Sequence, residues 1–414
     1  MNYFKEIECD VLVAGGGVAG AAAALSVARK GKKVILTEKA TQLGGLATIG
    51  LINFFVPMCN GRGVQIIKGM ADEFLKLSAK YSYDTIPDVW LKGEPGFGKT
   101  NVRLTSRYSA PIFSLVLCKE LNDAGVEVMF DTVITDSKAE NGKTRYVTLF
   151  NKSGFIKCGA KIFIDATGDS DLLHFAGVKT VTGGNYHSYW AFKADLKSCQ
   201  AAVESKNIEK LTSWITGGGA NLYGGGHPEG KPLWDGTDGD QVSKYFIENQ
   251  LELLGKLNEE DRKERDILEL PIMPQFRTTR HIDGDYTLKE EDAYKHFEDS
   301  VCAICDFDRR DYLYEVPYRT MVRRDCENII AAGRCASGEG YGWDVLRVIP
   351  PAILTGQAAG DAAVLAIDNN KNVAEINVKE LQNILESENV MIHFKDEWIP
   401  EKIIEDRDEN NGHF

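Results

Sequence analysis

The stretch Val11-Leu12-Val13-Ala14-Gly15-Gly16-Gly17-Val18-Ala19-Gly20 decides the fold of this chain. It is a short apolar run that ends in Gly-x-Gly-x-x-Gly and opens into an expected helix over residues 21–30. A turn at Gly31, a second apolar run over 33–36 and then Glu38 follow it. Strand, glycine loop, helix, strand and acid in this order predict a β-α-β unit that binds a dinucleotide.

Each part of this unit has a physical role in holding a dinucleotide. Gly15 makes the tight turn, Gly17 lets the pyrophosphate approach the backbone, and Gly20 lets the helix pack close to the strand. The N-terminus of the helix offers free N–H groups and a positive dipole end to the phosphates. Glu38 is placed to accept from the ribose hydroxyls, and an acid there disfavours a 2′-phosphate. The ligand is therefore expected to be FAD-like or NAD-like rather than NADP-like.

Length, charge and cysteine content exclude several classes of protein. A chain of 414 residues is too long for one compact core, so two domains are expected. The net charge is −13 and no basic block appears, so nucleic acid is not an expected partner. Nine cysteines, with no secretory signal before them, indicate reduced thiols in the cytoplasm. The uncharged run over 11–28 has the length of a membrane span, but its Gly and Ala content favours the dinucleotide unit, so no membrane span is predicted.

Helical and strand patterns alternate downstream of the opening unit. We expect a helix over 111–124, a strand over 126–130, and a β-meander with strands near 133–138, 144–150 and 155–158. A separate buried strand is expected over 161–165. The amino-acid composition changes after about residue 180, which indicates an inserted domain. This domain includes a charged stretch, from Asp238 to Asp266, that is expected to be helical. The opening pattern then resumes, with a strand over 328–333 and an Ala-rich helix from Ala352 to Asp368.

Cys302 and Cys305 form the one C-x-x-C of the sequence. A redox or metal role competes with a structural one, in which both are half-buried residues of a helix over Asp292–Asp308. The structural interpretation is favoured, because the pattern over Asp292–Asp308 predicts a helix, and no second cysteine pair stands at zinc-finger spacing. The sequence therefore predicts no metal site.

Four segments in order resemble one family of enzymes. They are Gly15-x-Gly17-x-x-Gly20 with Glu38, Gly44-Gly45-x-Ala47-Thr48, Asp165-Ala166-Thr167-Gly168-Asp169, and Asn328-Ile329-Ile330-Ala331-Ala332-Gly333-Arg334 with Arg347 and Gly356-Gln357-Ala358-Ala359-Gly360 behind it. Together they are similar to the FAD-dependent oxidoreductases of the glutathione-reductase-type flavoprotein superfamily, in the subgroup without a separate NAD(P)H domain. The resemblance covers about residues 7–180 and 325–370.

The resemblance implies an α/β fold with an inserted α+β substrate domain. The Rossmann-type FAD-binding domain, a parallel sheet with a β-meander, would be split between residues 1–180 and 325–370. The inserted domain would occupy 181–324, and a C-terminal helix with an acidic tail would occupy 371–414.

The resemblance also implies a cofactor role for each matching position. The Gly44–Thr48 segment would lie along the pyrophosphate and flavin, and a backbone group near Val133 or Ile134 would meet the adenine. A helix beginning near Pro350 would aim its N-terminus at the flavin pyrimidine. The implied FAD contacts are Gly15, Gly17, Val18, Ala19, Gly20, Glu38, Lys39, Gly44, Gly45, Leu46, Ala47, Thr48, Val133, Ile134, Ala166, Thr167, Gly168, Asp169, Gly333, Arg334 and Arg347.

Arg334 departs from the family pattern. Many members carry an acid directly after the glycine of the last strand, where it holds the ribityl chain, whereas this chain has Arg334 after Gly333. An arginine there can bind the pyrophosphate instead, which puts the ribityl contact in doubt.

The candidate catalytic residues lie in the stretch Arg277-Thr278-Thr279-Arg280-His281. Paired arginine donors can clamp a carboxylate or phosphate, and His281 can donate or accept a proton near neutral pH. In this interpretation Arg277 and Arg280 hold an anionic substrate over the flavin, and His281 or Tyr318 moves the proton that accompanies the hydride. The alternative is a basic surface turn that pairs with acids such as Asp283 and Asp285.

The sequence thus predicts an FAD-dependent oxidoreductase that transfers hydride between a small organic substrate and its flavin. A single dinucleotide fingerprint argues against a built-in NAD(P)H domain, so a separate electron donor or acceptor is expected. A homo-oligomer is compatible with the sequence. An NAD-binding dehydrogenase is the first alternative, but it leaves the later glycine motifs unexplained. A non-enzymatic nucleotide-binding scaffold is the second.

Overall fold

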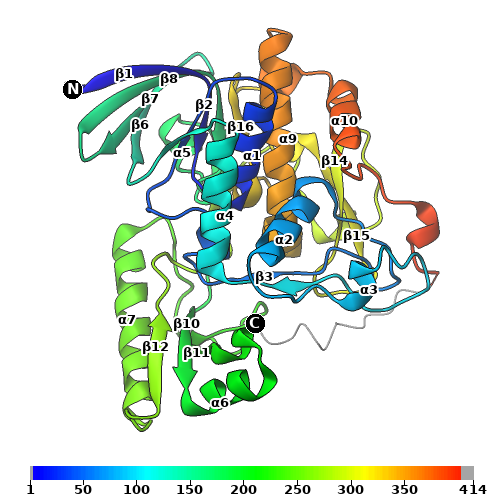
Figure 1. Ribbon diagram of the computed structural model, residues 1–414. Coiled ribbons are helices and arrows are strands. Elements are labelled where there is room, and N and C mark those ends of the chain that lie inside the picture. Colours follow the sequence, from blue (N-terminus) through cyan, green and yellow to red (C-terminus); the bar gives the residue numbers. More distant parts are fainter. Residues whose placement is uncertain (1–2, 402–414) are drawn as a thin grey trace.

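The computed structural model describes residues 3–401, and a seven-stranded sheet forms its centre (Figure 1). The strand order is β5-β2-β1-β8-β7-β6, and β16 also pairs with β8. The strands are β1 (Lys5–Ala14), β2 (Val34–Thr37), β5 (Glu127–Met129), β6 (Val133–Glu140), β7 (Lys143–Asn151), β8 (Gly154–Asp165) and β16 (Ile329–Ala331).

Strand register brings the carboxyl ends of four parallel strands to one edge of this sheet. Ala14 of β1 lies opposite both Thr37 of β2 and Asp165 of β8, and Asp165 lies opposite Ala331 of β16. The apolar runs that form these strands are buried, as parallel strands covered on both faces require. Loops that leave this edge therefore meet above it, where ligands of open α/β sheets bind.

Two long helices pack against each other on the sheet. They are α1 (Val18–Arg29) and α9 (Ile349–Asp368), blue and orange in Figure 1. A Cβ at Gly356 would lie 2.1 Å from the Ala19 carbonyl oxygen, and one at Gly360 would lie 2.6 Å from that of Ala23. Glycine at both positions therefore lets the two backbones approach closely.

A second lobe, green in Figure 1, is built on a three-stranded antiparallel sheet ordered β11-β10-β12. It has an aromatic core of its own, which includes Tyr189, Trp234, Tyr245 and Phe276. Its elements are β10 (Ser188–Asp195), α6 (Leu196–Ser205), β11 (Ser213–Gly219), α7 (Gly239–Asn258) and β12 (Arg265–Glu269).

The remaining helices and strands complete the molecule. They are β3 (Phe54–Phe55), α2 (Gly69–Lys80), α3 (Asp88–Leu91), β4 (Ser106–Arg107), α4 (Ala110–Asp123), α5 (Asp171–Phe175), β9 (Thr180–Thr182), β13 (Arg280–Ile282), β14 (Ser300–Cys305), β15 (Leu313–Pro317), α8 (Tyr341–Arg347) and α10 (Val378–Ser387). In the described part, no single helix has the length and apolar character of a membrane span, although α8 and α9, bent by 73° at their junction, meet the criterion as a pair.

Three expectations about local structure are wrong. The segments 155–158 and 161–165 are one strand, β8, which pairs with β7 in its first half and with β16 in its second. The helix expected over Asp238–Asp266 ends at Asn258, and β12 begins at Arg265. The helix expected over Asp292–Asp308 is instead a short 3-10 turn followed by β14.

Cys302 and Cys305 accordingly lie on a strand rather than on a helix. All six residues of β14 are buried. A strand buried on both faces does not alternate apolar and polar residues, so the sequence lacks the two-residue period that would have indicated a strand. The expected C-terminal helix is present as α10, whereas most of the expected acidic tail, residues 402–414, lies outside the described residues.

Candidate cofactor and substrate site

The glycine loop after β1 leaves open space at Gly17. A Cβ at Gly17 would meet nothing within 4 Å, and its φ of −64° suits any residue. Gly15, by contrast, has a φ of +96°, and its Cβ would lie 2.5 Å from the Ala166 carbonyl oxygen. A Cβ at Gly20 would lie 1.8 Å from the Gly15 carbonyl oxygen. The protein's own packing thus requires Gly15 and Gly20, whereas the space at Gly17 is free for a ligand.

The N-terminus of α1 opens at this loop. Ala21 N–H donates to the Gly17 carbonyl at 2.9 Å, so the N–H groups before it lie in the uncapped first turn. No side chain caps the helix, and its first turn carries no acid. The positive end of the helix dipole is therefore uncompensated by the chain, which suits a phosphate ligand.

Glu38 lies at the carboxyl end of β2 and is 6% exposed. One carboxylate oxygen accepts from Gly16 N–H at 2.7 Å, and the other accepts from Ala40 N–H at 2.8 Å. Glu38 thus fixes the glycine loop directly. Each oxygen keeps further lone pairs, so the ribose contact stays a prediction.

The second glycine segment lies against the first. Gly44 N–H donates to the Gly16 carbonyl at 2.8 Å, and Gly44 and Gly17 form a parallel bridge. Both Gly44 and Gly45 have positive φ, and a Cβ at Gly45 would lie 3.2 Å from the Gly17 Cα. A 3-10 turn, Gly45–Ala47, then carries the chain away from the loop.

Ala166-Thr167-Gly168-Asp169 supports the glycine loop from the end of β8. Thr167 donates to Asp165 through both its N–H and its hydroxyl, at 3.0 and 2.7 Å, which holds the turn under Gly15. Asp169 lies 4.0 Å from the Lys39 ammonium and 2.7 Å from the Arg334 guanidinium. Val133 and Ile134 begin β6 beyond Thr132, whose N–H donates to the Glu38 carbonyl at 3.1 Å.

Arg334 is held by protein groups rather than left open to a phosphate. It is 8% exposed and donates to Gly168, Asp169 and Phe276. Gly333, with a φ of +64°, packs against α1, where its Cβ would lie 2.8 Å from that of Ala19. Arg334 therefore fastens the last strand's loop to the Ala166–Asp169 turn and to the second lobe.

A pocket of about 170 Å³, the inner pocket, lies where the cofactor segments meet the second lobe. Leu46 and the start of α9, Val348 and Ile349, contribute to its lining. Arg277 and Arg347 are its two charged lining residues. Apolar side chains dominate the rest, as is typical of a pocket for a small organic molecule.

Two guanidinium groups of the inner pocket lie close enough to affect each other. Burial, and then the positive charge of Arg347, lowers the pKa of Arg277 to about 10. Arg277 donates to the carbonyls of Asn221 and Ala220, at 2.9 and 3.3 Å, so it has no carboxylate of its own among these contacts. Arg347 donates to Asp344 at 2.8 Å. Asp344 thus pairs directly with Arg347, and its charge also acts on Arg277.

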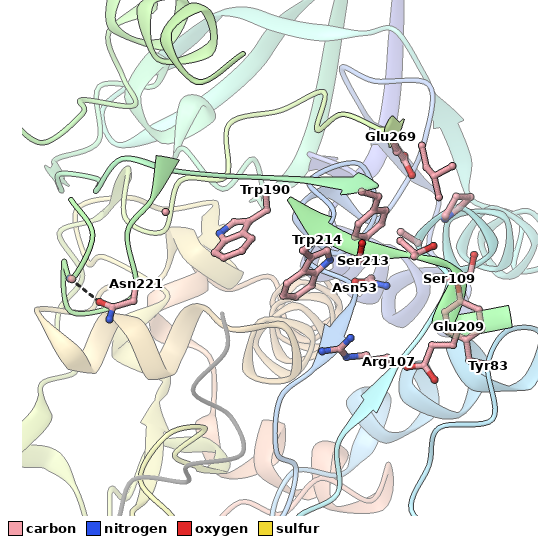
Figure 2. Close-up of a pocket in the computed structure, with 17 residues that line it drawn as sticks. Asn53, Tyr83, Arg107, Ser109, Trp190, Glu209, Ser213, Trp214, Asn221 and Glu269 are labelled. Atoms are coloured by element: carbon pink, nitrogen blue, oxygen red, sulfur yellow. Dashed lines mark hydrogen bonds between the residues drawn. The ribbon is translucent and has the colours of Figure 1, made fainter. Parts of the chain in front are cut away.

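A larger hollow of about 750 Å³, the outer cavity, adjoins the inner pocket (Figure 2). Trp190 and Trp214 line both spaces, with ring centroids 5.7 Å apart. The guanidinium of Arg107 stands over the Trp214 ring at 5.4 Å, and Glu209 and Glu269 also face the cavity. The two indoles therefore form the partition between a small apolar pocket and a wider cavity that also carries charged side chains.

The expected catalytic trio does not converge on one place. Arg280 is 8% exposed and donates to Asp171 at 2.9 Å and to the Asp169 carbonyl at 2.8 Å. Burial and the charges of Asp169 and Asp165 raise the pKa of Asp171 to about 6, and Arg280 opposes this rise. Arg280 thus joins β13 to the Asp169–Asp171 turn, whereas Arg277 lines the inner pocket.

His281 faces a third hollow, of about 870 Å³, together with Trp343. Its Nδ1–H donates to the Ile282 carbonyl at 2.6 Å, which leaves Nε2 as the acceptor nitrogen. Burial lowers the pKa of His281 and so favours the neutral ring. Its role in proton transfer stays a prediction. Arg347 lines the inner pocket beside Arg277, a pairing that sequence reasoning missed because 70 residues separate them.

These residues fit FAD as a ligand. The space at Gly17, the uncapped start of α1 and Glu38 provide for the phosphates and ribose, and the start of α9 provides for the flavin end. The start of α9 carries no side-chain cap either, and Pro350 and Pro351 lie in its first turn, as expected. A helix N-terminus there would stabilise the negative charge of a reduced flavin.

Comparison with known proteins agrees with this fit. A digeranylgeranylglycerophospholipid reductase of Sulfolobus acidocaldarius is 27% identical over 173 residues, 40% of this chain and 35% of that protein. The corresponding protein of Methanothrix thermoacetophila is 27% identical over 184 residues, 42% of this chain and 43% of that protein. The matches therefore span less than half of these curated relatives.

Among solved structures, a geranylgeranyl bacteriochlorophyll reductase-like protein of Thermoplasma acidophilum covers 95% of both chains, with 14% identity and a TM-score of 0.46. The family model for FAD dependent oxidoreductase matches residues 10–213 and 240–385, which is most of the sequence. The chain therefore belongs to the FAD dependent oxidoreductase family, which makes it a flavin-dependent oxidoreductase with FAD as its cofactor.

Proposed function

We propose that this oxidoreductase acts on a small organic anion whose reacting end enters the inner pocket. Bound FAD supplies hydride or electron transfer, and the protein positions the substrate and excludes water. The observation that carries the proposal is the pair Arg277 and Arg347 on one wall of an apolar pocket that begins at Leu46 and at the start of α9.

The positive charge of this wall favours an anion. Arg277 and Arg347 have one carboxylate between them, that of Asp344, so the group carries a net positive charge. A carboxylate or phosphate would offset the repulsion between the two guanidinium groups and accept paired donors from them. Arg277 is therefore the proposed substrate anchor. Arg280 is instead proposed to position the Asp169–Asp171 turn.

The shape of the site indicates the rest of the substrate. The inner pocket, about 170 Å³, holds only a small group, and its walls include Phe54, Phe276 and Phe307. The outer cavity, beyond Trp190 and Trp214, offers about 750 Å³ and a lining that includes the charged side chains of Arg107, Glu209 and Glu269. We infer a substrate with an apolar reacting part and a substituent that extends past the two indoles. Two relatives are named digeranylgeranylglycerophospholipid reductases, and a phospholipid substrate would fit this description.

The electron partner is proposed to be a separate small molecule or carrier. The sequence has one dinucleotide fingerprint, which the FAD site uses, so the chain is assigned to the glutathione-reductase-type subgroup without an NAD(P)H domain. His281 is proposed to take part in proton transfer from the side of Trp343. The nine cysteines are free thiols, which supports a reducing compartment such as the cytoplasm.

Anaerobic spectroscopy tests the proposal. The purified protein should carry about one FAD per chain, and its substrate should bleach or restore the flavin absorbance in the absence of oxygen. A neutral amide of the same substrate should react at least about 100-fold more slowly, because the paired arginine contact contributes several kcal/mol. Equal rates for the acid and its amide would contradict the anion assignment, and a chain unable to hold FAD would contradict the cofactor assignment.

A further inference from the structure

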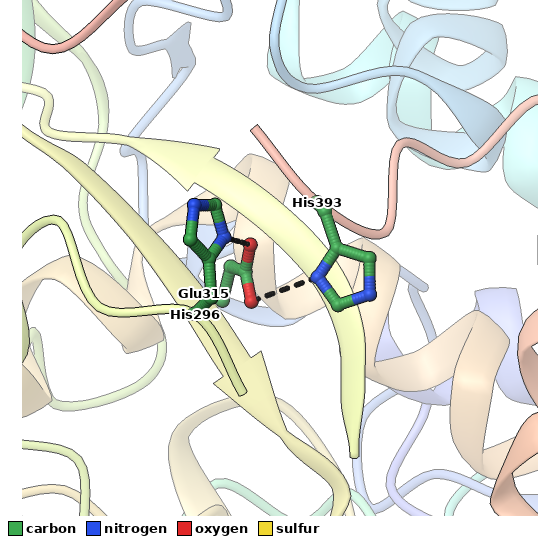
Figure 3. A group of neighbouring side chains, drawn as sticks. All are labelled: His296, Glu315 and His393. Carbon is green, nitrogen blue, oxygen red and sulfur yellow. Dashed lines mark hydrogen bonds and ion pairs between the residues drawn. The ribbon is translucent and has the colours of Figure 1, made fainter. Parts of the chain in front are cut away.

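Two histidines and a buried glutamate meet at the β14–β15 hairpin, outside the inner pocket (Figure 3). Glu315 lies on β15, His296 precedes β14, and His393 follows α10. The Nδ1 atom of His296 lies 2.6 Å from one carboxylate oxygen of Glu315, and that of His393 lies 3.0 Å from the other. One donor atom from each residue lies within 4.8 Å of the other two.

The Glu315 carboxylate is fully buried between two half-exposed imidazoles. Its side chain is 0% exposed, whereas both imidazoles are 41% exposed. Its charged neighbours among the described residues are these two imidazoles, and neither has the permanent charge of a lysine or arginine. A buried carboxylate needs a positive partner to offset its desolvation. A cation between the three side chains would supply one.

Neighbouring groups orient His296 and Glu315 for a ligand role. The Nε2 atom of His296 lies 2.9 Å from Asp396, which can keep accepting its proton when Nδ1 exchanges its hydrogen bond to Glu315 for a metal ion. Metal-binding histidines are commonly fixed by a carboxylate on their second nitrogen. Phe297 N–H donates to Glu315 at 2.7 Å and holds the carboxylate in place. The His296 ring packs on Phe394 at 4.4 Å.

We propose that His296, Glu315 and His393 bind a divalent transition-metal ion of the Zn²⁺ class. Two imidazole nitrogens and one carboxylate are a donor set that Zn²⁺ accepts, whereas Mg²⁺ and Ca²⁺ prefer oxygen alone. The exposed imidazole edges give the ion access from solvent and leave a coordination position for water. Small rotations of the side chains would replace the present hydrogen bonds by metal–ligand bonds.

We expect the metal ion to cross-link the segment after α10 to the β14–β15 hairpin. The segment after α10 already pairs with the hairpin, because Ala303 N–H donates to Met391 and the Ser300 hydroxyl donates to Ile392, at 2.6 and 2.7 Å. A metal held jointly by His393 and the hairpin would tie that segment down further. None of the three ligands lines the inner pocket, so we expect the ion to stabilise the fold without entering the reaction.

Titration of the chelator-treated, FAD-loaded protein with ZnCl₂ alone tests the site. Calorimetry should show one tight equivalent, with a Kd at or below about 1 µM, and a thermal midpoint raised by several degrees. His393→Asn, which changes a half-exposed ring, should weaken binding at least tenfold and abolish the thermal shift. His174→Asn, at an exposed histidine of α5, is the matched control and should bind as the wild type does.

Cobalt spectra distinguish metal binding at this site from metal binding by the cysteine thiolates. Co²⁺ bound by imidazole and carboxylate should give visible d–d bands without a thiolate charge-transfer band in the near ultraviolet, and these bands should be lost in His393→Asn and in Glu315→Gln. The flavin spectrum reports that each variant is folded. Absence of a stoichiometric equivalent in the wild type, unchanged binding in His393→Asn, or a thiolate band would each overturn the proposal.

Discussion

Arg277 and Arg347 line the same pocket, and burial together with the charge of Arg347 lowers the pKa of Arg277 to about 10. The pair comes from different parts of the chain. Arg277 follows the second lobe's aromatic core, and Arg347 ends α8 directly before α9. We therefore expect the charge of the substrate to be recognised at the junction of the two lobes, next to the start of α9.

Gly17→Val should yield a folded but colourless protein. A Cβ at Gly17 meets no protein atom within 4 Å, so the fold loses nothing, whereas the added side chain occupies the space of the pyrophosphate. The measurement is the ratio of flavin absorbance to protein absorbance after purification, with circular dichroism as the check on folding. Gly255→Val, on the exposed α7 with equally open space, should stay yellow, and a fully loaded Gly17→Val would refute the phosphate-loop assignment.

Glu38→Ala should weaken FAD binding by about tenfold or more. The carboxylate holds the loop through Gly16 and Ala40, and charge-assisted hydrogen bonds contribute about 1.5–3 kcal/mol each. The dissociation constant is measured by reconstituting apoprotein. FMN, which lacks the adenosine ribose, separates the two roles of Glu38: a loss confined to FAD indicates the ribose contact, and a loss for both flavins indicates loop support. An unchanged constant for FAD excludes both.

Trp214→Ala should remove the partition between the inner pocket and the outer cavity. The affinity for a small ligand such as benzoate should fall about tenfold, which corresponds to about 1.4 kcal/mol of lost contact. A longer ligand such as 4-phenylbenzoate should be affected less, because it already reaches the outer cavity. Flavin difference spectra measure both constants. Equal losses for the two ligands would show that Trp214 does not form the partition.

The stability of the protein should depend on pH through Asp361. Burial raises the pKa of this carboxyl to about 7 although Lys30 opposes the rise, and Glu388 adds to it. Between pH about 4 and 7 the folded chain therefore holds a proton that the unfolded chain has released. The folded state binds more protons in this window, so the free energy of unfolding falls as pH rises.

Asp361→Asn removes this titration, so the variant should lose less stability than the wild type between pH 5 and 8. Over this pH range, the fall in the free energy of unfolding should be about 1–3 kcal/mol larger in the wild type than in the variant. Thermal midpoints at pH 5, 6, 7 and 8 measure it. Parallel curves for the two proteins would show that Asp361 stays ionised in the fold.

The nucleotide half of the site could be predicted from the sequence because its parts are local. Gly15, Gly17 and Gly20 lie within six residues of one another, and Glu38 follows at the end of the next strand. Backbone conformation and helix ends at these positions depend on near neighbours. The structure brings each of these groups to the carboxyl edge of the sheet, where the pattern placed them.

The substrate half could not be predicted, because its residues meet only through the tertiary fold. Arg280 looked like a partner of Arg277 by spacing, yet it starts β13, whose pairing with β9 directs it to Asp171. Arg347 and Trp214 reach the pocket from segments with no shared sequence signal. His296, Glu315 and His393 likewise converge only because β15 and the segment after α10 pack together.

Benzoate titration of the FAD-loaded protein, monitored by the flavin absorbance, tests the central claim most directly. Benzoate is small, apolar and anionic, so it should bind in the inner pocket and perturb the flavin spectrum. Arg277→Ala should keep the flavin but weaken benzoate about 30-fold or more, equivalent to about 2 kcal/mol, whereas Arg324→Ala, at an exposed arginine, should change nothing. An Arg277→Ala protein that binds benzoate as tightly as the wild type, or a wild type that binds benzamide as tightly as benzoate, would contradict the account.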